Sequence, residues 1–440
     1  MYKYIEQGSY GGCLASERII CMEYYAKSKK VQFTSERINE IKKNMKNIEE
    51  CLKENLTETD VEILNSSITD IAEKTEEKQK TLKEHHKDIV TCAEMFFLEY
   101  GEYFTEKEKK LVVEACRIHD LGKVNLVFQA MICPKLAEKF HIDVRKTPQI
   151  PHGFLSAVTI SLDEFDDLSE LFSDKDFGPF ITAVYYHHDR EDHYNSPAIR
   201  KYAEKYYMKQ IEEYLNRKIR KLNCSNLDDL LFRNNVYTGK YIPDSNAWKE
   251  YLLIKGLLNK FDYTVSAGYE NAESAIDLHE KKLVKNIEKF LNGKELRPAQ
   301  KFMKMNTDKN LIVIAPTGSG KTEASLLWMN GEKSFYTLPL KVSSNAIYLR
   351  IKENYEYKDV ALLHSDAMAV YLREYNGNED IGEKYERSKM LSQPLTVCTV
   401  DQLFRFVYRA LGTEIFAATL KYSKLVLDEI QAYEPRVIAT

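Results

Sequence analysis

The pair His119-Asp120 is the feature of this sequence that is best suited to chemistry. A neutral imidazole next to a carboxylate offers two ligand types that suit a first-row divalent metal ion. Lys123 follows three positions later and would place a cation beside a phosphate group, while Gly122 permits a tight turn between them. Because a histidine–aspartate pair is common in proteins, the hypothesis of a metal site depends on further ligands elsewhere in the chain.

Further histidines lie where the surrounding residues predict burial. His85 shares a helical face with the apolar residues of the segment 82–96, although one inward histidine is more often a satisfied core residue than a ligand. His152 follows a loop with two prolines, and His187 and His188 follow a short apolar run. Neighbouring side chains on a helix point about 100° apart, so these two histidines can serve different metals or different sides of one cluster.

Asp262 completes the set of candidate metal ligands. It lies in an apolar stretch with helical spacing, where a buried carboxylate needs a partner and a metal ion is a suitable one. The full set of candidate ligands is His85, His119, Asp120, His152, His187, His188 and Asp262.

A second candidate site is the glycine-rich segment Ala315–Thr322, which follows a β-branched run and opens a helical pattern. This order of strand, loop and helix is the one that a P-loop requires. The helix N-terminus would add positive potential to the loop. We expect the phosphates of a nucleotide to meet the backbone N–H groups of Gly318, Ser319 and Gly320.

Side chains for the phosphates and the Mg²⁺ ion of the nucleotide come from two places. Lys321 would contact the β- and γ-phosphates of ATP, and Thr322 would bind Mg²⁺. Asp428 and Glu429 directly follow the apolar run 425–427. A carboxylate at the end of a strand in a P-loop sheet is placed to hold Mg²⁺, and Glu429 would then orient the attacking water.

The two candidate sites fall in parts of the chain with different hydrophobic patterns. Between residues 82 and 267 the pattern is mostly helical, and nearly all histidines lie there. After about residue 285, short β-branched runs alternate with helical patterns, which indicates a parallel α/β sheet. These runs are 311–314, 334–338, 395–399 and 425–427. The predicted fold class is therefore mixed, with an all-α domain followed by an α/β parallel-sheet domain.

Two charged segments allow two interpretations, a purely structural role or nucleic-acid binding. Residues 29–79 are rich in Lys and Glu with Ile and Leu at helical spacing, which favours an exposed helical hairpin with a solvated face over a DNA or partner surface. Residues 200–222 form a basic amphipathic pattern with aromatics. A buried stripe of Tyr, Ile and Leu is favoured there, while the clustered Lys and Arg leave nucleic-acid binding open.

The composition sets limits on the class of protein. With 440 residues, two or three domains are expected, and a net charge of −4 gives no global attraction for nucleic acid. The 8 cysteines include no CxxC pair, which argues against a zinc knuckle or a disulfide framework and favours a reducing cytoplasm. No apolar run predicts a signal peptide or a membrane span.

The α/β part resembles the first lobe of superfamily 2 helicases. Besides the P-loop and Asp428-Glu429, the segment Arg297–Gln300 resembles their glutamine motif, in which Gln300 would read adenine. Segments 338–345, 363–365 and 399–402 resemble the motifs that grip a DNA strand through backbone N–H and hydroxyl contacts to phosphate. Within them, His364 is expected to pack or hydrogen-bond rather than to act in catalysis.

The histidine-rich part resembles the HD phosphohydrolase superfamily and, within it, the nuclease domain of the CRISPR-associated helicase–nuclease of type I systems. The resemblance rests on four short matches and selects His85 over His86 as the ligand. They are His85 in Glu84–Val90, His119–Lys123 with Phe128-Gln129, His152 with Ser156-Ala157, and Asp262 with Ser266. Segment Asp428–Tyr433 resembles the same family. Departures from that family are Asp189 for a glycine and Gln431 for a histidine. Ala315 replaces the first glycine of the general P-loop pattern, a variation that is common in helicases.

The resemblance implies two metal ions, of Mn, Fe, Co or Ni, in the HD site. One would be held by His85, His119, Asp120 and Asp262, and Asp120 would bridge to a second held by His152, His187 and His188. Catalytic roles would fall to Asp120 and Lys123 in the HD site and to Glu429 beside ATP and Mg²⁺. The implied partners are single-stranded DNA fed from the helicase and a CRISPR RNA-guided surveillance complex, with no membrane.

The implied domains are an HD nuclease domain over 1–285, in which 29–79 is an insertion, and a first RecA-like lobe over 286–440. A second lobe, in cis or in trans, is needed for unwinding, so we expect this chain alone to bind ATP without unwinding DNA. Two alternatives remain. One is an HD phosphohydrolase acting on nucleotides with an ATP-sensing P-loop lobe, and the other is a non-catalytic truncated product that binds DNA or a partner.

Overall fold

The computed structural model describes residues 24, 26, 80–160, 174–188, 196–219, 246–274, 280–374, 381–404, 412–435 and 438. The segment 29–79, predicted as a helical hairpin, and Asp189 lie outside the described residues. Tyr24 and Ala26 are buried at the start of the first described helix. Leu82 N donates to Tyr24 O at 2.8 Å, and Ala26 N donates to Lys80 O at 3.0 Å.

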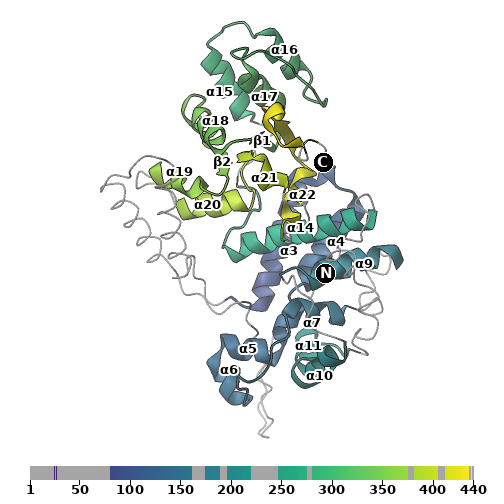
Figure 1. The fold of residues 1–440 in the computed structure, drawn as a ribbon. Coiled ribbons are helices and arrows are strands. Elements are labelled where there is room, and N and C mark those ends of the chain that lie inside the picture. Colours follow the sequence, from purple (N-terminus) through teal and green to yellow (C-terminus); the bar gives the residue numbers. More distant parts are fainter. Residues whose placement is uncertain are drawn as a thin grey trace, which may run out of the picture.

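The N-terminal part consists mainly of α-helices (Figure 1). They are α3 (Leu82–Tyr100), α4 (Glu106–Ile118), α5 (Leu126–Ile132), α6 (Pro134–Lys139), α7 (His152–Thr159), α9 (Asp174–Tyr185), α10 (Ser196–Tyr206), α11 (Met208–Leu215) and α14 (Asn246–Ser266), with 3-10 turns η1 (Gly101–Tyr103) and η2 (Leu121–Val124). Capping boxes begin two of these helices, because Thr81 pairs with Glu84 at α3 and Thr105 pairs with Glu108 at α4. No described helix is both long and apolar enough to cross a membrane.

The single basic helix predicted over 200–222 is wrong. The chain leaves helical geometry at Tyr207, with φ of −131°, and continues as the separate helix α11. The Tyr207 side chain is fully buried and its hydroxyl lies 2.7 Å from Thr159 Oγ1, so burying this tyrosine against α7 accounts for the break.

The C-terminal part is an α/β structure with a parallel four-stranded sheet in the order β2-β3-β1-β4. The strands are β1 (Ser334–Leu338), β2 (Val360–Leu363), β3 (Leu395–Thr399) and β4 (Lys424–Leu427). The helical elements are α15 (Lys282–Leu291), α16 (Pro298–Met305), α17 (Lys321–Met329), α18 (Lys341–Glu353), α19 (Ala367–Arg373), α20 (Ile381–Lys389), α21 (Val400–Leu403), α22 (Glu414–Leu420) and η5 (Ile430–Ala432). The predicted mixed fold class is confirmed, and β2 is a strand that the sequence reading did not name.

The run 311–314, expected as a buried strand before the P-loop, is not paired into the sheet. Ile312 and Ile314 are 96% and 97% exposed. Within the described residues β4 pairs only with β1, and the run 311–314 does not pair with the other edge of β4. A β-branched pattern alone is therefore not enough to predict a strand, because a strand forms only where a partner strand supplies hydrogen bonds.

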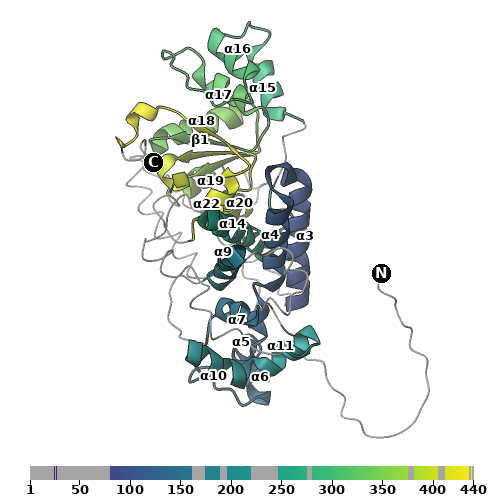
Figure 2. The same ribbon diagram turned by 90° about the vertical axis from the view of Figure 1, so that its right-hand side faces the viewer.

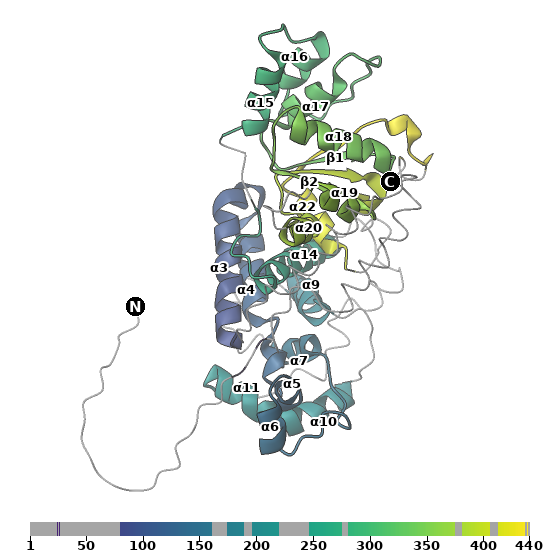
Figure 3. The same ribbon diagram turned by 90° about the vertical axis from the view of Figure 1, so that its left-hand side faces the viewer.

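The two parts meet along α14, which lies side by side with α22 in Figure 2 and Figure 3. Gly256 of α14 permits this approach, since a Cβ there would lie 2.4 Å from Glu414 O. Beside this contact lies a buried group of side chains that we call the junction cluster. It consists of Lys260, Glu273, Lys333 and Tyr422.

The junction cluster connects α14 to the segments that precede three of the strands. Glu273 accepts hydrogen bonds from Tyr422 Oη at 2.8 Å and from Lys333, and lies 2.9 Å from Lys260 Nζ. Lys260 also donates to the carbonyl oxygens of Met390 and Leu391. The helical part and the sheet are therefore held together by buried charged and polar contacts in addition to apolar packing.

Candidate metal centre and nucleotide site

The candidate metal centre is assembled around Asp120, at the end of α4 where η2 begins. The seven predicted ligands all lie at this centre, and they come from five helices or helix ends. His85 comes from α3, His119 and Asp120 from the end of α4, His152 from the first residue of α7, His187 and His188 from the turn after α9, and Asp262 from α14.

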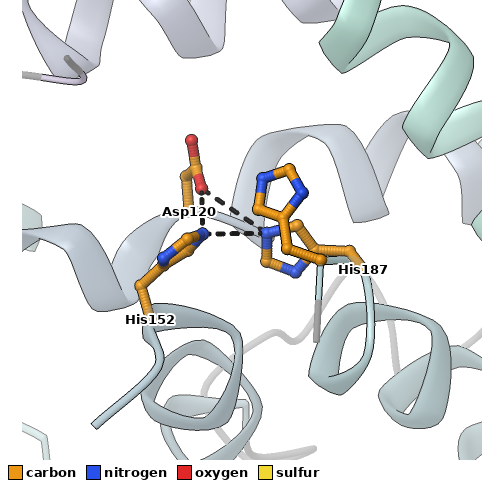
Figure 4. A group of neighbouring side chains, drawn as sticks. Asp120, His152 and His187 are labelled. Carbon is orange, nitrogen blue, oxygen red and sulfur yellow. Dashed lines mark hydrogen bonds and ion pairs between the residues drawn. The ribbon is translucent and has the colours of Figure 1, made fainter. Parts of the chain in front are cut away.

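One group of ligand atoms surrounds Asp120 Oδ1. His152 Nε2 lies 3.2 Å and His187 Nε2 lies 3.6 Å from that oxygen, and the two imidazole nitrogens are 3.1 Å apart. Figure 4 shows His152 and His187 pointing at the same end of the Asp120 carboxylate. With His188, the ligand atoms all lie within 4.8 Å of one another.

A second group shares Asp120 through its other oxygen. His85 Nε2 and His119 Nε2 each lie 3.4 Å from Asp120 Oδ2. Asp262 joins both groups, with Oδ1 at 3.2 Å from His85 Nε2 and Oδ2 at 3.4 Å from His188 Nε2. Since α9 ends at Tyr185, the 100° helical offset expected between His187 and His188 does not apply, and both contribute to the group around Asp120 Oδ1.

Backbone contacts set the direction of two of these imidazoles. His119 Nδ1 lies 3.0 Å from Cys116 O, and His187 Nδ1 lies 2.6 Å from Val184 O. A proton on Nδ1 leaves the Nε2 lone pair free to point into the centre, which is the tautomer that a metal ligand needs.

The electrostatics favour ionised carboxylates and mostly neutral imidazoles. Burial opposes ionisation of Asp120, but the nearby His119 and Lys123 hold the pKa of that carboxyl well below its usual value. Burial lowers the pKa of His152 to about 4 and also lowers the pKa of His187 and His188. Metal ligands must be deprotonated, and these groups already are at neutral pH.

His85 differs from the other ligands in the direction of its shift. Burial lowers its pKa, but the contacts with Asp120 and Asp262 outweigh burial and the net pKa is raised. A proton on this imidazole therefore competes with a cation for the same two carboxylates.

The donor atoms fit a divalent metal ion. His85 Nε2, His119 Nε2 and Asp120 Oδ1 are buried and make no hydrogen bond with the described residues. A buried polar atom without a partner is costly, and native structures contain few of them. A cation between the imidazoles and carboxylates would satisfy all three atoms. A mixed set of nitrogen and oxygen donors is one that first-row divalent metal ions accept.

Lys123 is held inside the centre. Its Nζ donates to Asp120 Oδ2 at 2.6 Å, and the side chain is buried. Gly122 is required by close approach, because a Cβ there would lie 2.0 Å from His152 O. The backbone of Gly122 also donates to Ser156 Oγ at 2.8 Å, which joins η2 to α7.

Two residues that support this turn were missed from the sequence. Asn125 Nδ2 donates to Gly122 O at 2.6 Å, and Tyr202 Oη donates to Asn125 Oδ1 at 3.0 Å. Asn125 follows Lys123 by two residues, and asparagine is a residue type typical of a helix N-cap, which is the position it takes at α5. Tyr202 carries no local signal, since it lies on α10 and meets the turn only in the folded chain.

The nucleotide site has the P-loop backbone that the sequence predicts. Gly318 and Gly320 adopt φ of 78° and 83°, which favours glycine, and α17 begins at Lys321. Lys321 Nζ donates to Ala315 O at 3.2 Å. Gln300 is buried beside the loop, and its Nε2 lies 3.5 Å from Gly320 O.

The carboxylates of the nucleotide site lie directly after β4. Asp428 Oδ2 accepts a hydrogen bond from the Tyr336 hydroxyl at 2.6 Å, and Thr322 is a second hydrogen-bond neighbour of that hydroxyl. Tyr336 lies in a run that was read only as a strand, so its polar role was missed. Glu429 is exposed, has φ of 53° and accepts a hydrogen bond from Gln431.

His364 has a structural role, as expected. Its Nε2 lies 2.6 Å from Asn345 Oδ1, and its Nδ1 accepts from Asp366 N at 3.1 Å. Burial lowers the pKa of His364 to about 4, so the imidazole is neutral. Both of its ring nitrogens are used in hydrogen bonds, and the contact with Asn345 joins two of the expected DNA-gripping segments.

Comparison with known proteins agrees with both halves of the chain. Residues 72–246 match the Cas3 HD domain, and residues 297–437 match the DEAD/DEAH box helicase family. The CRISPR-associated nuclease/helicase Cas3 of Methanothermobacter thermautotrophicus is 24% identical over 434 residues, which cover 84% of this chain and 50% of that protein.

Solved structures show the same fold. The crystal structure of T. fusca Cas3 matches with a TM-score of 0.53 and 18% identity, and its AMPPNP form matches with 0.51 and 17%. Each match covers 82% of this chain and 46% of the T. fusca chain, so this chain spans about half the length of the relatives it matches. In the order of its two matched domains and in sequence, the chain is thus similar to the Cas3 CRISPR-associated nuclease/helicases.

Proposed function

We propose that this chain is a metal-dependent nuclease that cuts single-stranded DNA, joined to the ATP-binding lobe of a DNA helicase. The observation that carries the proposal is the pair of ligand groups that share Asp120 and leave buried nitrogen and oxygen atoms without hydrogen bonds. Two divalent ions in such a site stabilise the attacking and leaving oxygens of a phosphodiester.

The ligand roles follow from the two groups. His85, His119, Asp120 and Asp262 would hold one ion, and Asp120 with His152, His187 and His188 would hold the other. Lys123 lies beside the shared carboxylate, where its ammonium group would face the negative charge of a bound phosphate. The lowered pKa values of the Asp120 carboxyl and the His152 imidazole keep these ligands deprotonated near neutral pH.

The α/β part would bind ATP with Mg²⁺ through Lys321, Thr322 and Asp428, with Glu429 orienting the water. We propose domain bounds of 1–285 for the nuclease and 286–440 for the first RecA-like lobe. A second lobe would complete the motor, because superfamily 2 helicases close ATP between two lobes. The proposed partners are single-stranded DNA and an RNA-guided surveillance complex.

The decisive experiment measures metal content and cleavage of a labelled single strand by wild type, Asp120→Ala and Lys321→Ala. We expect Asp120→Ala to lose bound transition metal and cleavage together. Lys321→Ala is the matched control, because it removes the phosphate-binding lysine from the other site and should leave cleavage intact. Unchanged cleavage by Asp120→Ala would contradict the assignment. Release of product from dNTPs without DNA cleavage would favour a nucleotide phosphohydrolase instead.

A further inference from the structure

Access to the metal centre is restricted to one side. His85, His119 and Asp120 are fully buried. The ligand side chains with substantial exposure are His188, at 34%, and His152, at 15%. A phosphodiester that reaches the centre must therefore approach across these two imidazoles.

An aromatic ring lies against the first of them. Tyr263 follows Asp262 on α14, so when the carboxylate points into the centre the tyrosine points toward its rim. Its ring is nearly parallel to that of His188, with 12° between the planes and 6.3 Å between centroids. Tyr263 is 36% exposed, whereas the other large aromatics of this helix, Trp248, Tyr251 and Phe261, are buried.

A second ring lies against the other exposed imidazole. Phe128 of α5 is half-buried, and its ring centroid lies 5.8 Å from that of His152. Lys123 Nζ lies 6.0 Å from the same ring centroid. Each partly exposed ligand thus has an aromatic neighbour, and the two neighbours come from different helices.

Resting on the proposed nuclease function, we propose that Tyr263 and Phe128 stack on the bases that flank the cleaved phosphate. A phosphate on the metal centre places one nucleotide toward His188 and the other toward His152. Aromatic side chains bind unpaired bases by stacking with little sequence preference, because every base has a π-face. Paired bases present only their edges, so the two rings would select a single strand over a duplex.

The first test is DNA binding by the metal-loaded full chain, measured by fluorescence anisotropy with a labelled single strand in which every linkage is a cleavage-resistant phosphorothioate. From the known contribution of base stacking, Tyr263→Ala and Phe128→Ala should each weaken binding roughly 10-fold. Tyr263→Trp should bind as wild type does. The matched control is Phe290→Ala, which truncates a 45% exposed aromatic on α15.

The second test removes the base instead of the ring. A strand with an abasic site beside the cleaved linkage should bind wild type as weakly as the intact strand binds Tyr263→Ala or Phe128→Ala. Combining the abasic site with the matching variant should cause no further loss. In cleavage, each variant should raise KM for single-stranded DNA and leave kcat near wild type.

Equal binding of intact and abasic strands by wild type would overturn the proposal. So would loss of bound metal in Tyr263→Ala and Phe128→Ala, since the rings would then act by supporting His188 and His152. Failure of the nuclease function is distinguishable, because a metal-free or cleavage-inactive wild type would show it before any ring is changed.

Discussion

The metal centre and the junction cluster are both buried groups of charged side chains, and both include a residue of α14. Asp262 belongs to the centre and Lys260 to the junction. Two residues of a helix correspond to a rotation of about 200°, so these two side chains leave α14 on nearly opposite sides. The three donors of Lys260 meet a carboxylate and two carbonyl oxygens. At the metal centre, by contrast, His85 Nε2, His119 Nε2 and Asp120 Oδ1 converge and make no hydrogen bond with the described residues.

This difference separates a structural cluster from a ligand site. Buried polar groups are normally hydrogen-bonded, so a satisfied cluster needs nothing further to be stable. An unsatisfied cluster is costly unless something else occupies it. The junction cluster is therefore expected to stabilise the fold by itself, and the metal centre to contribute most of its stability when a cation is bound.

The largest effect should follow from breaking the junction. Glu273→Gln leaves Lys260 and Lys333 without their carboxylate, and removing one partner of a buried pair costs about 3–5 kcal/mol. Urea unfolding should record this loss. The control is Glu383→Gln, whose carboxylate pairs with Arg387 at 42% side-chain exposure and should cost less than about 1 kcal/mol. Equal losses of unfolding free energy in the two variants would contradict a stabilising role for the junction cluster.

A metal ion should stabilise the protein through the centre alone. At a free Mn²⁺ concentration of about 1,000 times Kd, linkage predicts roughly 4 kcal/mol of added stability. Asp262→Asn should lose most of this increment, because its carboxylate contacts ligands of both groups. Glu273→Gln should start from a lower stability and gain the same increment. An increment that shrinks in Glu273→Gln would mean that the two clusters are coupled through α14.

The smallest effect concerns pH. In the metal-free protein the raised pKa of His85 contributes stability that is fully present below the unfolded value of about 6.5 and is lost as pH rises through the folded pKa. A metal ion must displace that proton, so its affinity should rise with pH by up to about 1.4 kcal/mol per pH unit in this window.

Calorimetric titrations with Mn²⁺ in buffers of different ionisation enthalpy would count the displaced protons near pH 7. We expect His85 to release a proton, because its pKa is raised, and His152 to release none, because its pKa of about 4 leaves it neutral. A His85→Asn variant that releases as many protons as wild type would contradict this assignment.

Much of the metal centre was predictable from local sequence. His119-Asp120 lies at a helix end, and His152 begins a helix after a proline loop, so their positions carry recognisable patterns. That all seven ligands meet at one centre could be predicted only by considering them together. Which carboxylate oxygen each imidazole faces depends on how the helices pack, and no local pattern encodes that.

The junction cluster had no signal in the sequence. Lys260, Glu273, Lys333 and Tyr422 are far apart along the chain and have no regular spacing. Lysines and glutamates are mostly exposed in proteins, so their burial here depends on the close approach that Gly256 permits. The strand predicted over 311–314 does not form for a related reason, since strand formation depends on a neighbouring strand as much as on the sequence of the run itself.

The unpaired edge of β4 has a consequence for the behaviour of the protein in solution. Within the described residues it presents a row of backbone donors and acceptors, and the same part of the chain carries Ile312 and Ile314, which are almost fully exposed. Natural sheets protect such edges, because an open one is a template for strands of other molecules. The half that carries the nucleotide site is therefore the half most prone to aggregation, and covering this edge would improve solubility as well as complete the sheet.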